Sequence, residues 1–289
     1  MGRILKKFTW LNYKIGRAII WLKWFDASLY LQKSSDDELR IIGKRILHMK
    51  PSTFPYDYIY RYYDMPVEVN RDEEGYPYVY DNGLELYGKK QWNDEEMRDY
   101  YVSLLLEQDI ESPHCYITDD RRMPDIGDVL VDLGAAEGIF SLRMIDRVGK
   151  CYLFECDDEW IEPLKKTFSK WEKKVVLVNK FVGDKTDDRN NMITLDDYFI
   201  DNKIDYIKAD IEGAEVDMIL GARKTLSNCK RVLACSYHYQ DDEKKIRRLL
   251  SDSEFDIFIN EGYMMYYSFF RRFKRPYVRR GVIYGEKLQ

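Results

Sequence analysis

Short apolar runs alternate with amphipathic stretches from residue 128 to the C-terminus. The runs are Val129–Leu133, Cys151–Glu155, Val175–Val178, Ile204–Asp210, Arg231–Ser236, Phe255–Ile259 and Val282–Gly285. Segments of ten or more residues with helical periodicity separate most of these runs. Apolar strands joined by helices are typical of a parallel sheet that is covered on both faces. The pattern therefore predicts an α/β domain at residues 124–289.

The first part of the chain predicts helices and a small antiparallel sheet. Residues 1–24 repeat apolar side chains at three- and four-residue steps, with basic side chains on the opposite side, and predict an amphipathic helix. A second helix is expected to begin at Ser35, whose hydroxyl would cap it, and a third to span residues 94–108. Alternation around two turn signals predicts a β-meander with strands at Val67–Val69, Tyr76–Tyr80 and Leu84–Tyr87. We expect residues 25–123 to form an accessory α+β region.

Basic residues are concentrated in two segments. The net charge is −5, from 46 Lys and Arg against 51 Asp and Glu, but residues 1–24 and 269–280 each carry six basic residues and no acid. Without these twelve, 34 basic residues face 51 acidic ones, a net charge of −17. Such a distribution favours local attachment to an anionic surface over general nucleic-acid binding, which requires a basic main fold.

We expect both basic segments to contact an anionic membrane surface, with Trp10, Trp21 and Trp24 at the level of the headgroups. The alternative is a helix docked on its own domain or on a second subunit of a homo-oligomer. The longest candidate for a membrane span, residues 15–24, is interrupted by Gly16, Arg17 and Lys23, and no cleavable signal is recognisable. The five cysteines (115, 151, 156, 229 and 235) form no CxxC pair, which argues against a zinc site and a disulfide framework. We therefore expect a cytoplasmic protein, peripheral at the inner face of the membrane if the basic segments bind there.

The segment VLVDLGAAEGIFSL, residues 129–142, joins the first predicted strand to a helix. Gly134 and Gly138 allow a tight turn close to a ligand, but the dinucleotide fingerprint GxGxxG is absent, which disfavours a dehydrogenase. Asp132 closes the strand and Glu137 begins the helix, and both carboxylates would repel a pyrophosphate. A ligand with an ammonium and a sulfonium group, such as S-adenosylmethionine (SAM), would find partners there. At the end of the second strand, Glu155 is placed to accept hydrogen bonds from both ribose hydroxyls.

Four segments in this order and spacing, DLGAAEGIFSL, YLFEC, ITLDDY (193–198) and IKADIEGAE (207–215), resemble the FkbM family of SAM-dependent methyltransferases. The similarity covers about residues 115–286. It implies the class I methyltransferase fold, a Rossmann-like sheet of seven strands with the last one antiparallel. It also implies methyl transfer, mostly to oxygen atoms and commonly to those of sugars in surface glycans or natural products.

The resemblance assigns the methionine end of SAM to the loop after the first strand, the ribose to Glu155 and the adenine to Lys180–Val182. The expected cofactor contacts are Asp132, Gly134, Ala135, Glu137, Gly138, Glu155, Cys156, Phe181 and Asp210.

Methyl transfer to a hydroxyl gains about 10²–10⁴-fold from a base that removes the proton. Asp210 and Glu212 follow the fourth strand, and crowding should raise the pKa of such carboxyl groups. His238 closes ACSYH at the neighbouring strand end, so we predict catalytic roles for His238, Asp210 and Glu212. Glu215 is expected to begin the next helix, and His48 to be structural inside a helix.

The acceptor is expected to contact His114, just before the α/β domain, and Tyr237. A tyrosine-rich region, residues 56–101, is either an aromatic platform for sugar rings or ordinary packing. The basic, aromatic segment near the C-terminus suits a phosphate-linked or lipid-linked acceptor. RNA is a less favoured anionic partner, because no RNA-binding module is recognisable in residues 1–123.

A divalent cation could bind among Asp210, Glu212, His238 and Asp241 and orient a sugar diol. Their spacing matches no recognisable ligand pattern, so we expect no metal site. The sequence thus predicts a SAM-dependent O-methyltransferase that acts on a glycan hydroxyl, with a role in polysaccharide biosynthesis. The alternative is a non-catalytic glycan- or membrane-binding protein that retains the methyltransferase fold.

Overall fold

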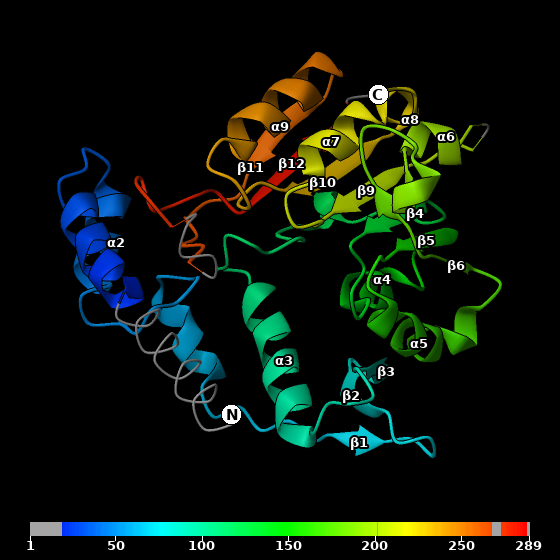
Figure 1. The fold of residues 1–289 in the computed structure, drawn as a ribbon, viewed down its shortest axis with the longest axis horizontal. Helices are drawn as coiled ribbons and strands as arrows, with labels where there is room; N and C mark the ends of the chain where they lie inside the picture. The colour runs from blue at the N-terminus through cyan, green and yellow to red at the C-terminus, as the bar shows by residue number, and fades with distance from the viewer. Residues whose placement is uncertain (1–18, 201, 268–272, 288–289) are drawn as a thin grey trace, which may run out of the picture.

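The computed structural model describes residues 19–200, 202–267 and 273–287, and Figure 1 shows their arrangement. Most of the helix predicted at 1–24 and part of the basic segment 269–280 lie outside these ranges. Among the described residues, no helix has both the length and the apolarity needed to cross a membrane.

A seven-stranded sheet forms the C-terminal half, in the order β11-β12-β10-β9-β4-β5-β6. The strands are β4 (Val129–Leu133), β5 (Lys150–Phe154), β6 (Val175–Val178), β9 (Tyr206–Ala209), β10 (Arg231–Cys235), β11 (Asp256–Ile259) and β12 (Val282–Glu286). β12 runs antiparallel to β10 and β11, whereas β10, β9, β4, β5 and β6 are mutually parallel. This confirms the predicted class I methyltransferase sheet, and each strand lies within about two residues of its predicted range.

Helices cover both faces of the sheet. They are α4 (Ile139–Met144), α5 (Asp158–Thr167), α6 (Leu195–Tyr198), α7 (Glu215–Leu220), α8 (Arg223–Asn228) and α9 (Asp242–Asp252). Neighbouring residues of β4 enter different cores, since Leu130 packs with α4 and α5 while Val131 packs with α6–α9. A small parallel pair, β7 (Phe181–Val182) and β8 (Met192–Ile193), and short 3₁₀ turns at Asp120–Arg122, Ser169–Trp171 and Asp188–Asn190 complete this half.

The accessory region supplies α2 (Asp37–Arg45), a 3₁₀ turn (Asp57–Tyr62), the strands β1 (Asn70–Arg71), β2 (Pro77–Asp81) and β3 (Leu84–Tyr87), and α3 (Asp94–Glu107). The antiparallel meander and α3 are confirmed, but the first strand falls at 70–71 rather than at Val67–Val69. The cap of α2 is Asp36, not Ser35, because its carboxylate accepts hydrogen bonds from Glu38 N and Leu39 N. His48 lies exposed in a bend after α2, so its predicted place inside a helix is wrong.

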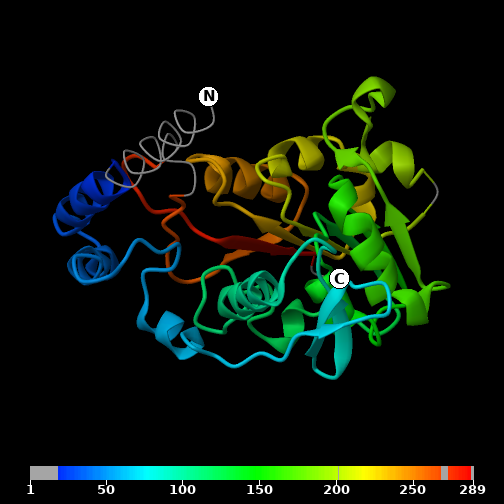
Figure 2. The ribbon, with the colours of Figure 1, turned by 60° about the horizontal axis from the view of Figure 1, so that its bottom comes forward.

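Helix α3 packs on the same face of the sheet as α4 and α5. Its side chains Met97, Tyr101 and Leu104 share one buried cluster with Leu130 of β4. In Figure 2, α3 and α9 lie on opposite sides of the sheet. The accessory region therefore contributes directly to the core under the carboxyl ends of the strands.

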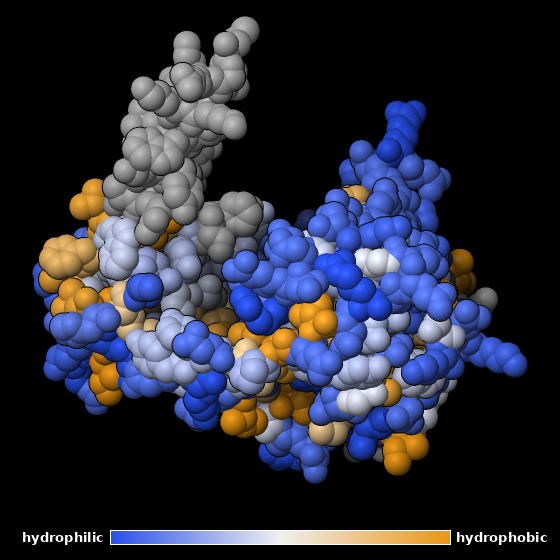
Figure 3. Space-filling model, turned by 90° about the horizontal axis from the view of Figure 1, so that it is seen from below, coloured by the Kyte–Doolittle hydropathy of each residue, from blue (hydrophilic) through white to orange (hydrophobic). Residues whose placement is uncertain are grey.

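The helix at residues 19–31 packs against a segment close to the C-terminus. Trp24 is 2% exposed in a cluster with Met265, Phe273 and Tyr277, and its Nε1 donates a hydrogen bond to Ile46 O at 2.7 Å. The expectation that Trp24 reaches lipid headgroups is therefore wrong, because its side chain is buried on the face of the helix that packs against the rest of the protein. The other face stays exposed, with Trp21, Leu22 and Phe25 at 46%, 70% and 55%. Figure 3 shows apolar side chains at the end of the molecule that contains this helix, on the left of the view.

Candidate active site

A cavity of about 530 Å³ opens at the carboxyl ends of the parallel strands. Its walls come from the loops after β4, β5, β6 and β9, from Tyr237 after β10, and from α3. β4 lies between β5 and β9, so the strand order reverses at this point, which is where open α/β sheets bind ligands. Gly134, Ala135, Glu137, Glu155, Cys156, Phe181, Asp210, Glu212 and Tyr237 line the cavity, as do Lys180 and Val182.

The loop after β4 is folded tightly against β9. Gly134 has φ +70°, and a Cβ on it would lie 1.9 Å from Asp210 O, so only glycine fits. Glu155 holds the same loop from the other side. Its Oε2 accepts a hydrogen bond from Ala136 N and its Oε1 one from Asp157 N, both at 2.8 Å. Each oxygen keeps a second acceptor site for a ligand.

Asp132 lies beneath the loop and does not line the cavity. Its Oδ2 accepts a hydrogen bond from Ser141 Oγ at 2.7 Å, and its Oδ1 lies 3.0 Å from Lys208 Nζ. Lys208 Nζ also donates to Gly134 O at 2.9 Å. The structure thus corrects the assignment of Asp132 as a direct cofactor contact: the carboxylate is already paired inside the sheet and fixes the loop. Gly138, at the start of α4, also lies outside the cavity lining.

Glu137 presents a buried carboxylate to the cavity. Tyr100 OH, from α3, donates to Glu137 Oε2 at 2.6 Å, and Ile139 N donates to Oε1 at 3.3 Å. Burial raises the pKa of Glu137 despite these hydrogen bonds. A carboxylate held in this way is stabilised by a cationic ligand.

Asp210 is the centre of a polar network. Its Oδ2 accepts a hydrogen bond from Tyr116 OH at 2.7 Å, and its Oδ1 one from Tyr237 OH at 3.2 Å. Burial by itself would raise the pKa of Asp210, but His114, His238 and Lys208 hold it well below its ordinary value. The expectation that crowding raises this pKa is therefore wrong, because hydrogen-bond donors and cations outnumber the acids around Asp210. An acid with such a low pKa is a weak general base.

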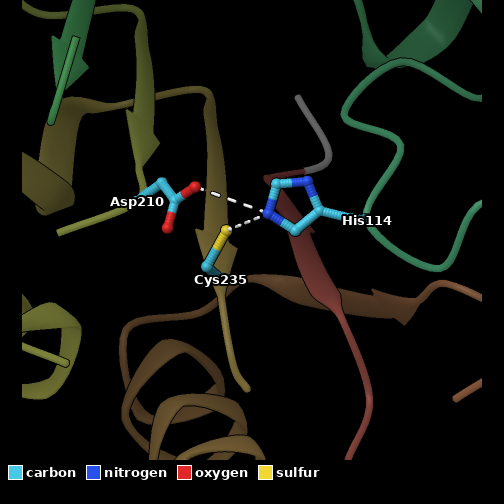
Figure 4. A group of neighbouring side chains, drawn as sticks. All are labelled: His114, Asp210 and Cys235. Atoms are coloured by element: carbon cyan, nitrogen blue, oxygen red, sulfur yellow. Dashed lines mark hydrogen bonds and ion pairs between the residues drawn. The ribbon is translucent and has the colours of Figure 1, made fainter. Parts of the chain in front are cut away.

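His114 donates to this network, and its tautomer follows from Gln108. Gln108 Oε1 accepts a hydrogen bond from Tyr116 N at 3.0 Å, so the amide nitrogen faces His114 Nδ1 at 3.3 Å. His114 Nδ1 therefore accepts, and the proton sits on Nε2, which lies 3.4 Å from Asp210 Oδ2 and 3.6 Å from Cys235 Sγ. Figure 4 shows this nitrogen between the two groups. Since His114 is buried and does not line the cavity, it supports Asp210 rather than facing an acceptor.

His238 is fully buried behind the cavity wall, so the structure places it out of direct contact with an acceptor. Its Nδ1 lies 3.1 Å from Glu215 Oε1, while its Nε2 lies 3.6 Å from Asp210 Oδ1 and 3.7 Å from Glu212 Oε2. Burial lowers the pKa of His238, but these three carboxylates prevail and raise it. Glu215 begins α7 as expected and is itself buried. Glu212 is largely exposed and lines the cavity.

Glu107, at the C-terminal end of α3, is a cavity residue that the sequence reasoning missed. Among the residues that the structure describes, no group hydrogen-bonds or ion-pairs with its carboxylate. Burial, with smaller contributions from Asp210 and Glu137, raises the pKa of Glu107 to about 7. An acid on an accessory helix carries no local signal, whereas Lys208, a lone cation within a buried strand, could have been recognised.

The tyrosine-rich region does not form an aromatic platform in the cavity. Tyr56, Tyr58, Tyr60, Tyr62, Tyr63, Tyr78 and Tyr80 all lie outside the cavity lining, which takes Tyr100 and Tyr116 instead. Tyr56 OH donates to Glu38 Oε1 at 2.7 Å, and Tyr62 OH to Asp109 Oδ2 at 2.5 Å. These two tyrosines therefore hold the accessory region together.

Residues 182–263 match the family model described as the methyltransferase FkbM domain, a range that contains Asp210 and His238. No curated protein matches the chain. Among solved structures, the chain is similar to the methyltransferase FkbM from Methylobacillus flagellatus KT, with 18% identity and a TM-score of 0.45. That match covers 67% of this chain and 55% of the other, so the chain spans little more than half of that protein's length.

Two further solved structures are similar to the chain. One is precorrin-6y C5,15-methyltransferase from Geobacter metallireducens GS-15, with 14% identity and a TM-score of 0.37 over 57% of this chain and 83% of that one. The other is a Streptococcus mutans protein in complex with SAH, with 12% identity and a TM-score of 0.42 over 64% and 97% of the two chains.

Proposed function

We propose that this chain, an FkbM-type methyltransferase, uses SAM to methylate a hydroxyl group of a sugar. The observation that carries the proposal is the cavity at the carboxyl ends of β4, β5 and β9, whose polar lining is dominated by carboxylates. SAM supplies a methyl group on a sulfonium, which an acceptor oxygen takes by in-line displacement. The chain's own residues would bind, orient and exclude water, and near-attack alignment contributes up to roughly 7–11 kcal/mol.

The residues around the loop after β4 fit SAM. Glu155 keeps one free acceptor site on each oxygen, which matches the two hydroxyls of a ribose. Trp160, Phe181 and Val182 supply apolar surface for a base. Glu137 adds a buried negative charge that an ammonium or sulfonium group offsets.

The charge balance of the cavity supports a cationic ligand over a nucleotide phosphate. Six acids line it, namely Glu107, Glu137, Glu155, Asp157, Asp210 and Glu212, against two lysines, Lys180 and Lys208. The ammonium group of Lys208 is already paired with Asp132. A pyrophosphate would meet several carboxylates here, which disfavours the dehydrogenase alternative.

Glu107 is the general base that we propose for the acceptor hydroxyl. Its carboxylate lines the cavity from α3, on the wall that also contains Tyr100 and Gln108. A base with a pKa near the working pH is the most effective proton acceptor in a transition state, and Glu107 suits this better than Asp210. Tyr116 and Tyr237 would present aromatic faces and hydroxyls to the sugar.

The cofactor assignment is tested by calorimetry with SAM. Glu155→Ala should weaken binding at least about tenfold, since it removes charge-assisted hydrogen bonds. Glu162→Ala, on the exposed side of α5, removes the same charge and should leave the affinity unchanged. Equal SAM affinities in the two variants would reject the ribose assignment, as would tighter binding of NAD or ATP than of SAM.

The acceptor is tested by incubating the full chain with labelled SAM and a panel of free, phosphate-linked and lipid-linked glycans. Label in a sugar fraction supports O-methylation. SAM binding without transfer to any member, while RNA is labelled instead, would move the proposal to another acceptor class. Tight glycan binding without SAM binding would favour the non-catalytic alternative.

A lipid-linked acceptor and peripheral attachment at the cytoplasmic face of a membrane remain part of the proposal. They are supported by the two basic segments and by the exposed apolar face of the helix at 19–31. A second copy of the chain is the alternative occupant of that face.

A further inference from the structure

Two groups of side chains around Asp210 have the composition of a metal site. The first joins Asp210 to His114 and Cys235, and the second joins it to Glu215 and His238. In each group, one ligand atom per residue lies within 4.8 Å of the others. The two groups differ in whether the ring nitrogens of their histidine already have hydrogen-bond partners.

The group around His114 is satisfied without a cation. Gln108 donates to Nδ1, so Nε2 carries the proton and points it toward Asp210 and Cys235. A ring nitrogen that carries a proton cannot bind a metal. Asp210 Oδ2 also already accepts a hydrogen bond from Tyr116 OH.

The group around His238 keeps unpaired atoms, although Asp210 Oδ1 accepts a hydrogen bond from Tyr237 OH and Glu215 Oε1 accepts one from Ile211 N. His238 is fully buried, and neither of its ring nitrogens makes a hydrogen bond of acceptable geometry with the described residues. Glu215 Oε2 is also buried without a hydrogen-bond partner. Buried polar atoms are nearly always paired in folded proteins, and each exception calls for an explanation such as a bound ion.

The ring of His238 is surrounded by negative charge. Nδ1 faces Glu215, and Nε2 faces both Asp210 and Glu212. A neutral imidazole has one N–H, so one of its nitrogens would turn a lone pair toward a carboxylate. Either a second proton or a cation removes this repulsion. Ligand atoms around a cation of about 2.1 Å bond length are roughly 3.0–3.5 Å apart, close to the 3.6 Å between Nε2 and Asp210 Oδ1.

We propose that Asp210, Glu215 and His238, with Glu212 at the cavity edge, bind a divalent cation. Carboxylates combined with one imidazole suit Mn²⁺, Fe²⁺ or Zn²⁺. Asp210 and Glu212 line the cavity, so the cation would be reached from the acceptor side. Any role in orienting two neighbouring sugar hydroxyls rests on the proposed function, whereas binding of the cation does not. Asp241, a further candidate from the sequence, turns away to Lys245 at 2.7 Å.

The test is titration of the EDTA-treated full chain with Mn²⁺, with free Mn²⁺ followed by electron paramagnetic resonance. One Mn²⁺ should bind per chain, and Glu212→Gln should weaken the affinity about tenfold or more. Glu212 is largely exposed, so this variant should fold even if His238→Ala does not. Asp241→Asn removes an exposed acid of the same region and should leave Mn²⁺ binding unchanged.

Absence of saturable Mn²⁺ binding would overturn the proposal and leave His238 as an imidazolium among carboxylates. Equal Mn²⁺ affinities in wild type and Glu212→Gln would place any bound Mn²⁺ elsewhere and overturn it as well. SAM affinity is measured on the same samples. Intact SAM binding without Mn²⁺ binding rejects the cation site alone, and lost SAM binding with Mn²⁺ bound rejects the proposed function alone.

Discussion

Lys208 Nζ lies 3.0 Å from Asp132 Oδ1, and the two side chains are 5% and 1% exposed. The pair joins β9 to the end of β4, and the hydrogen bond from Lys208 to Gly134 O extends it to the loop that forms one cavity wall. A lysine is rarely buried to this degree unless it is paired. The pair therefore couples the stability of the sheet to the shape of the site.

Lys208→Met should lower the free energy of unfolding by about 3–5 kcal/mol, because it leaves the carboxylate of Asp132 buried and uncompensated. Urea unfolding followed by circular dichroism measures the change. The double variant Lys208→Met/Asp132→Asn should recover part of the loss. If the double variant is less stable than the single one, the pair is not coupled as described.

Gly134→Ala should destabilise the protein and weaken SAM binding, because the new Cβ would fall 1.9 Å from Asp210 O. Gly75 is a matched control, since its φ of +86° is similar and nothing lies within 4 Å of its Cβ position. Gly75→Ala should therefore cost only the left-handed strain, about 1–2 kcal/mol, with SAM affinity unchanged. Thermal melting and calorimetry compare the two, and equal losses of stability would argue against the close approach to Asp210.

Glu107→Gln should lower kcat about 10²–10⁴-fold with little change in SAM affinity. Ionised Glu107 is the active base, so the rate of the wild type should rise with pH through about 7, and this rise should be absent in Glu107→Gln. The charges of Asp210, Glu137 and Glu212 add to the raised pKa of Glu107, and His114 opposes it. A variant with normal kcat would assign the base elsewhere.

The same pKa predicts an effect on stability that needs no acceptor. In the folded chain the pKa of Glu107 lies at about 7, above the ordinary 4.5, so the folded state binds more protons between these values. Stability should then fall as pH rises from about 4.5 to about 7. Glu107→Gln removes this decline, so its melting temperature relative to wild type should be higher at pH 8 than at pH 5. An equal difference at both pH values would contradict the raised pKa.

Leu22→Glu and Phe25→Glu should reduce sedimentation of the protein with anionic vesicles, since both side chains lie on the exposed face of the helix at 19–31. Point variants are preferable to deletion of residues 1–24, which would remove Trp24 from its buried cluster. Ile126→Glu changes an apolar side chain that is 85% exposed elsewhere and serves as the control. Unchanged sedimentation, together with a smaller size by gel filtration, would assign this face to a second copy of the chain.

The local pattern of the chain determined the sheet and the cavity loop. A strand that is buried on both faces of a sheet needs an uninterrupted run of apolar residues. Such runs, flanked by turns, correctly predicted β4 to β6 and β9 to β12. Gly134, Glu137 and Glu155 lie at strand ends, so their place in the cavity followed from topology alone.

The tertiary structure alone decided which of these groups remain available to a ligand. Asp132 and Glu107 are both acids, yet Asp132 is paired with Lys208, 76 positions away, whereas the carboxylate of Glu107 meets no such partner among the described residues and lines the cavity. Pairing, burial and pKa depend on which groups long-range packing brings within a few ångströms, and no local spacing encodes that. For the same reason, the place of Glu107 in the cavity depends on the packing of α3 against the sheet. The burial of Trp24 likewise depends on the packing of the helix at 19–31 against residues near the C-terminus.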